Sequence, residues 1–144
     1  FKHALIQEVA YESLLSVRRR GVHAAAARAL EALHRGRLEQ VYDRLADHWY
    51  RAEEAEPAVE FLSRFAAQAA GAYAHAEASE ALQKALALVG QLPEEARKRI
   101  KVYLVEELGE VLALTLRGAS FREGRLLFGE EKPGDVAPLA AYHH

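Results

Sequence analysis

Three kinds of side chain in this sequence are able to do chemistry. Carboxylates occur as adjacent pairs, histidines are scattered along the chain, and three arginines stand together at positions 18–20. Paired carboxylates serve acid–base catalysis, histidines transfer protons or bind metals, and clustered arginines bind phosphate or acidic protein. The spacing within each group decides which of these functions is possible.

The carboxylate pairs do not have the spacing of a catalytic pair. They are Glu53-Glu54, Glu94-Glu95 and Glu106-Glu107. Neighbouring residues on a helix point about 100° apart, so the members of each pair diverge instead of meeting at one substrate. We interpret these pairs as solvated helix faces.

The histidines and the motif search also argue against an enzyme. His23, His34, His48 and His75 have no second histidine four residues away, which is the spacing of a helical metal pair. The chain has no Cys, and we find no Gly-rich phosphate loop and no nucleophile elbow. The sequence therefore predicts no catalytic residue, no metal site and no cofactor.

The strongest charge cluster is Arg18, Arg19 and Arg20, which Arg28, Arg35 and Arg37 extend along the chain. It is a candidate contact for a phosphate or an acidic protein partner, and the alternative is a solvated corner between helices. The net charge is -2 and no aromatic residues interleave the arginines, so no direct nucleic-acid binding is expected.

Composition predicts an all-α domain. The chain has 144 residues, half of them apolar, and alanine is abundant while Gly and Pro are sparse. No apolar run reaches the ~20 residues that a membrane span needs, and Cys is absent, so we expect a cytoplasmic location. The apolar spacing and the Gly and Pro positions predict helices at 3–16, 17–34, 37–53, 56–72, 75–90, 94–117 and 120–129.

Small and large apolar residues recur in a pattern typical of tetratricopeptide repeats. The first match has Tyr42, Leu45, Ala46 and Trp49, then Ala58 and Leu62, and the second has Leu62, Phe65, Ala66 and Ala69, then Ala78, Leu82 and Ala85. Val105, Leu108, Gly109 and Leu112 open a third, degenerate match. We therefore expect antiparallel helical hairpins that stack as a right-handed superhelix with a concave surface, in which Trp49 is a packing wedge.

The opening string FKHALIQEVAYESLL, followed by SVRRRGVHAAAARALEAL, resembles the region after the ATPase module of bacterial STAND-type signalling proteins. These include regulators fused to adenylate or guanylate cyclase domains and LuxR-type regulators, and the resemblance covers about residues 1–90. It implies an end of a winged-helix segment or linking helix at 1–16 and a tetratricopeptide-like array at 17–129. We interpret 130–144 as an irregular tail. Its His143 and His144 are either native residues or part of a purification tag, and we assign them no function.

The same resemblance gives His3 a role in the parent protein only. The Phe-x-His-x-Leu string is similar to the MHD-type motif of related nucleotide switches, whose His contacts the β-phosphate of ADP. By that analogy His3 is the matching residue, and Ala4 stands where the motif has Asp. The alternative is that His3 caps or packs at the start of the first helix.

These observations lead to three hypotheses about function. The first is a non-catalytic protein-interaction and regulatory region of a larger bacterial signalling ATPase, which binds a protein, a peptide or another domain of its parent, or self-associates. The second is a free-standing peptide-binding adaptor, whose concave groove clamps an extended peptide or its carboxylate with Lys, Arg, Asn or Tyr. The third is a small helical enzyme or ligand-binding bundle, which needs a pocket where His48, Tyr50 or a buried Glu converge.

Overall fold

The computed structural model describes residues 2–128, with side chains described for 2–118. This part of the chain is helical and contains no strand, which confirms the all-α prediction. The predicted tail at 130–144 lies outside the described residues. The elements are α1 (Lys2–Leu33), the short 3-10 helix η1 (Leu38–Val41), α2 (Tyr42–Arg51), α3 (Ala55–Gly71), α4 (His75–Leu88), the 3-10 helix η2 (Val89–Gln91) and α5 (Glu94–Phe128).

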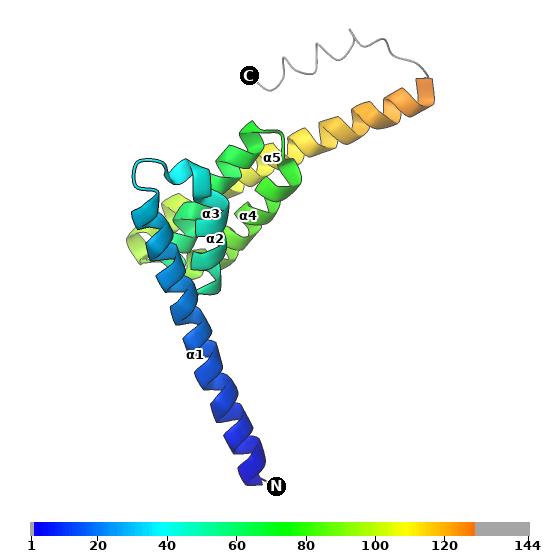
Figure 1. Cartoon of the computed structure of the whole chain (residues 1–144). Coiled ribbons are helices and arrows are strands. Elements are labelled where there is room, and N and C mark those ends of the chain that lie inside the picture. Colours follow the sequence, from blue (N-terminus) through cyan, green and yellow to red (C-terminus); the bar gives the residue numbers. More distant parts are fainter. Residues whose placement is uncertain (1, 129–144) are drawn as a thin grey trace.

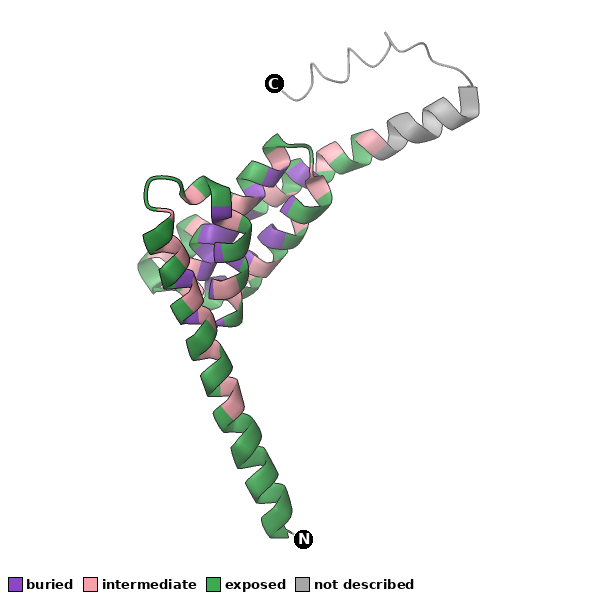
Figure 2. Ribbon diagram, viewed as in Figure 1, coloured by how far each residue is buried: buried purple, intermediate pink, exposed green. Residues whose placement is uncertain are grey.

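Each helix packs against the next one along the chain, and α3 is central because it contacts both α2 and α4 (Figure 1). The first half of α1 and the last part of α5 extend away from these packed helices in different directions (Figure 1). Figure 2 shows that the buried residues gather where α2, α3 and α4 meet. The packed unit therefore has its core in the middle of the sequence.

The core is made largely of alanine, which supplies nearly half of the buried residues. Ala58, Ala66 and Ala69 are buried on α3, and Ala78 and Ala85 are buried on α4. A side chain of one carbon lets two helix backbones approach closely, and larger residues fill the remaining space. Of these larger residues, Val41, Leu45 and Leu104 are the most completely buried.

The turns that end α2 and α3 have the same backbone geometry. After α2, Glu53 has a φ of 58°, and the amide groups of Glu53 and Glu54 donate to the carbonyl oxygens of Tyr50 and Trp49. After α3, Tyr73 has a φ of 63°, and the amide groups of Tyr73 and Ala74 repeat this pattern one helix later. This arrangement is a Schellman motif, which reverses the chain in a few residues and satisfies the last carbonyl groups of the helix.

Two of the predicted helix boundaries are wrong. The sequence predicted separate helices at 3–16 and 17–34, but α1 is continuous through both ranges. The predicted helices at 94–117 and 120–129 are likewise joined in α5. Near the two predicted breaks, after residues 16 and 117, the sequence has Gly21 and Gly118 but no Pro. A lone glycine costs a helix only about 1 kcal/mol, which is too little to end a long helix.

The two predicted repeat matches occupy buried or half-buried positions throughout. They are offset by one helix, since the first spans α2 and α3 and the second spans α3 and α4. The third match behaves differently. Val105 and Leu112 are 52% and 43% exposed, and Gly109 is also exposed, so these residues do not form a third copy of the core.

Trp49 joins α1 to the rest of the core. It is buried in the same cluster as Ala24 and Ala27 of α1, and the Arg28 guanidinium lies 5.7 Å from its ring centroid. Among residues 2–118, the Trp49 indole N–H is buried without a hydrogen-bond partner. The prediction that Trp49 is a packing residue agrees with this position.

Replacing Trp49 tests how much the α1 contact depends on it. Trp49→Ala should lower the free energy of unfolding by about 3–5 kcal/mol, because it leaves a cavity at the α1–α2 contact. Trp49→Phe should cost clearly less, because it keeps an aromatic ring and removes the unpaired N–H. Urea denaturation followed by circular dichroism measures both values, and equal losses for the two variants would contradict this account.

Candidate protein-binding groove

An open groove of about 230 Å³ runs between α2 and α4, with α3 beneath it. We call it the α2–α4 groove. Its floor is apolar and is formed by Ala46, Leu62 and Ala81, which are buried, together with the half-buried Phe65. Alanines at two of these four positions keep the floor low. The groove can therefore receive an apolar side chain from a partner.

Both rims of the groove carry carboxylates. Asp43 and Asp47 are four residues apart on α2, and Glu77 and Glu80 are three residues apart on α4, so each pair lies on one helix face. Lys84 is the one basic residue among those that line the groove. The rims are therefore negatively charged on two sides of an apolar floor.

Cations neutralise only part of this charge. Arg51 Nε lies 3.0 Å from Asp47 Oδ1, and Lys84 Nζ lies 3.3 Å from Glu80 Oε1. Asp43 and Glu77 have no ion pair within residues 2–118. The unpaired charge is therefore concentrated at the start of α2 and of α4.

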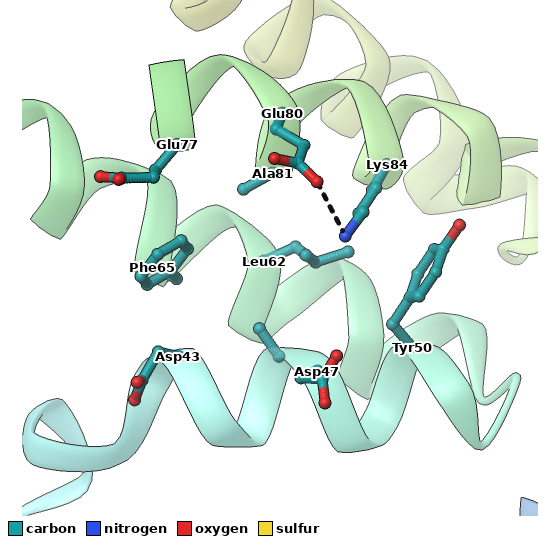
Figure 3. A pocket seen from close by; sticks show the side chains of 10 residues that line it. Asp43, Asp47, Tyr50, Leu62, Phe65, Glu77, Glu80, Ala81 and Lys84 are labelled. Atoms are coloured by element: carbon teal, nitrogen blue, oxygen red, sulfur yellow. Dashed lines mark ion pairs between the residues drawn. The ribbon is translucent and has the colours of Figure 1, made fainter. Parts of the chain in front are cut away.

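The two ends of the groove differ in character. Figure 3 shows Phe65 between Asp43 and Glu77 at one end, and Lys84 beside Tyr50 at the other. Lys84 Nζ lies 5.1 Å from the centroid of the Tyr50 ring, which is a cation–π distance. The two ends of the groove therefore differ in charge, since the carboxylates of Asp43 and Glu77 lie at one end and the ammonium group of Lys84 at the other.

A second, larger groove of about 440 Å³ lies between α3 and the first turns of α5. We call it the α3–α5 groove. Its apolar lining includes Val59, Leu92 and Ile100, and its charged residues all belong to α3. Glu60 and Arg64 pair with each other at 3.2 Å. With charge on one rim only, this groove offers less to orient a partner than the α2–α4 groove.

Two side chains near the α3–α5 groove have raised pKa values. Burial raises the pKa of the Tyr103 hydroxyl, and the nearby Glu107 charge raises it further. A hydrogen bond to the Tyr42 hydroxyl, at 3.4 Å, raises the pKa of the Arg64 guanidinium. Arg64 therefore stays cationic and Tyr103 stays neutral at physiological pH.

The structure separates the three clustered arginines. Arg20 Nη1 lies 3.2 Å from Glu53 Oε2 and donates to Ser16 Oγ at 3.0 Å, so Arg20 helps to hold α1 against the turn after α2. Arg18 and Arg19 are exposed on other faces of α1. Contact of Arg18 and Arg19 with a partner or an anion stays a prediction.

His3 lies on the exposed first turn of α1, and neither groove includes it. Its role as a nucleotide contact in a parent protein stays a prediction. His48 and Tyr50, which the enzyme hypothesis would bring to one pocket, diverge here. Tyr50 lines the α2–α4 groove, whereas His48 turns towards α1.

Two groupings of side chains in the structure were not predicted from the sequence. His23 Nδ1 and His48 Nδ1 approach to 3.0 Å and link α1 to α2, although the residues are 25 positions apart. Among the described residues no third His, Asp or Glu joins them in a group that could hold a metal ion. The acidic groove was also missed, although the spacing within Asp43-Asp47 and Glu77-Glu80 places each pair on one helix face.

Comparison of the chain with protein-family models, curated proteins and solved structures found no significant match. The resemblance to the region after STAND-type ATPase modules therefore stays a prediction. No described helix combines the length and the apolar character needed to cross a bilayer.

The raised pKa of Tyr103 gives a testable pH effect. A folded-state pKa above the ordinary value of 10.0 means that folding favours the neutral phenol. This contribution to stability is present below about pH 10 and is lost as the pH rises through the folded-state value. Wild type should lose thermal stability relative to Tyr103→Phe between about pH 9 and pH 11. A parallel decline of the two proteins would contradict the assignment.

Proposed function

We propose that this chain is a non-catalytic protein-interaction and regulatory scaffold, and that its α2–α4 groove binds a partner segment rich in basic and apolar side chains. The observation that carries this proposal is the apolar floor with carboxylates on both rims. The partner is a protein or a peptide, or another domain of a larger bacterial signalling ATPase or transcription or cyclase regulator.

The chemistry of the groove favours this kind of partner. An apolar side chain seated over Leu62 and Phe65 would lose contact with water, which drives association. Lys or Arg side chains on either flank would meet Asp43 or Glu77, whose charges are not neutralised within the described chain. Such rim pairs contribute mainly to the association rate and to specificity, and they weaken as salt screens them.

The negative charge of the α2–α4 groove limits which ligands the adaptor hypothesis can assume. A clamp for a peptide carboxylate needs Lys, Arg or Asn side chains in the groove. The α2–α4 groove instead carries four acidic residues and one Lys, so it repels an acidic peptide end. A free-standing adaptor remains an alternative only if its ligand is basic.

The proposal of an arm within a larger protein draws support from α1. Apolar residues in the first half of this helix are widely exposed, with Ile6, Val9 and Leu14 at 65%, 68% and 69%. A helix segment that packs on nothing is only marginally stable in water. We propose that residues 1–16 pack against a preceding module, as the predicted linking helix would.

We further propose that the helices stack as a tetratricopeptide-like right-handed superhelix, with the α2–α4 groove on its concave surface. The equivalent turns after α2 and α3 and the buried small residues at matching positions support this arrangement. Successive helices then present alternate faces, and α2 and α4 share one of them. A partner bound there would contact two helices at once.

Neutralising the rims tests the binding role. Asp43→Asn combined with Glu77→Gln should weaken binding of a fluorescein-labelled amphipathic Lys/Leu peptide by about tenfold, because each lost rim charge contributes up to ~1 kcal/mol. Fluorescence anisotropy at low and high salt measures the affinity. Wild-type binding should weaken with salt more steeply than binding by the variant.

The matched control removes two other carboxylates. Glu94→Gln combined with Glu95→Gln changes the net charge equally but lies in the first turn of α5, away from the groove. This variant should bind the peptide as wild type does. Equal weakening in both double variants would mean that only overall charge attracts the peptide, which would contradict a groove site.

The regulatory part of the proposal is tested in the full-length parent protein. Removing residues 17–129 should change the basal rate of nucleotide hydrolysis, because the arm would shift the ATPase between two conformations. A coupled phosphate-release assay measures this rate. A deletion that leaves the rate unchanged would sink the regulatory role without affecting the peptide-binding result.

A further inference from the structure

One face of α5 carries apolar residues that none of the other described helices covers. Val102, Val105, Leu112 and Leu116 are 56%, 52%, 43% and 69% exposed, and Gly109 completes the series. Their spacing along the helix is three, four, three and four residues. This is the seam of a coiled coil, in which apolar residues recur every 3.5 positions.

The seam lies on the side of α5 away from the core. Leu104 and Val111, which are buried, lie on the opposite face of the helix and pack in the core cluster. The last part of α5 also extends beyond the other helices (Figure 1). A second helix can therefore lie along the seam without displacing α4.

We propose that α5 pairs in parallel with α5 of a second copy of this chain, as a two-stranded coiled coil. Val102, Gly109 and Leu116 occupy the a positions, and Val105 and Leu112 occupy the d positions. In this arrangement each seam residue meets its own counterpart across a two-fold axis. The pairing uses a different surface from the α2–α4 groove, so its failure would leave the proposed function standing.

Charges beside the seam favour a second copy and a parallel orientation. In a parallel pair a g residue meets the e residue five positions later on its partner. Lys101 then faces Glu106 of the second copy. No ion pair within residues 2–118 uses either of these side chains. The contact joins opposite charges, and symmetry doubles it.

The antiparallel alternative lacks these contacts. If two α5 helices crossed at Gly109 in opposite directions, Lys101 would lie opposite Arg117 and Glu106 would lie opposite Leu112. Neither charge would then be neutralised by the partner. The flanking sequence thus distinguishes the two orientations, and it matches the parallel one.

Gly109 and the shortness of the seam keep this pairing weak. A glycine at an a position adds no apolar surface, and the apolar seam spans about two heptads, whereas stable coiled coils usually have three or four. We therefore expect a reversible dimer whose population rises with concentration. An added Cβ at Gly109 would meet no atom within 4 Å, so the site has room for a larger residue.

Cysteine cross-linking tests the pairing and its direction, because the chain has no native Cys. Val105→Cys and Leu112→Cys should each form a disulfide-linked dimer on mild oxidation, since equivalent d positions are neighbours in a parallel pair. Glu110→Cys, exposed but off the seam, should remain monomeric. Cross-linking at only one of the two d positions, or equally at all three sites, would overturn the proposal.

Charge reversal and sedimentation velocity provide the second test. Lys101→Glu and Glu106→Lys should each weaken the dimer several-fold, and the double variant should restore it. Gly109→Leu should strengthen the dimer at least tenfold. Gly21→Leu, in open space on α1, raises helix propensity in the same way and should leave the dimer unchanged. The pairing would be refuted if the wild-type chain and the Gly109→Leu variant both stayed monomeric at about 100 µM.

Discussion

The close contact of α3 with α2 and α4 is the interaction on which the rest of the structure depends. Buried alanines such as Ala58, Ala66 and Ala78 line these contacts and let the helix backbones approach. Schellman turns after α2 and α3 then reverse the chain within a few residues, so that neighbouring helices lie against each other. Larger side chains at either of these contacts would separate the helices and open the core.

The α2–α4 groove is a direct consequence of this packing. Both α2 and α4 pack against α3, and α3 forms the floor between them. Short residues on the floor leave room above it, while Asp43 and Glu77 rise from opposite sides. The negative groove, the exposed start of α1 and the seam of α5 are three separate surfaces. Under the proposed function, these are the surfaces at which other proteins or domains would bind.

Much of the fold follows from local sequence, whereas the site depends on which helices become neighbours. Alanine content and the residues around Pro57 and Pro93 predict helices, and the apolar spacing around Leu62 predicts its burial. The break after residue 16 was wrong, because no residue there costs enough to end a helix. The pairing of His23 with His48, and that of the two acidic rims, requires tertiary contacts. The exposed residues of α5 matched a repeat in spacing, but spacing alone does not show whether a neighbouring helix covers them.

The most direct test of the binding groove is a ¹⁵N chemical-shift titration of the whole chain with the amphipathic Lys/Leu peptide. Shift changes should concentrate on the amide groups of the α2–α4 groove, at Asp43, Asp47, Tyr50, Glu77 and Lys84. The amide groups of Val59, Ile100 and Tyr103, in the α3–α5 groove, should change little. Changes centred on the α3–α5 groove, or spread evenly over every acidic residue, would contradict the assignment of the α2–α4 groove as the binding site.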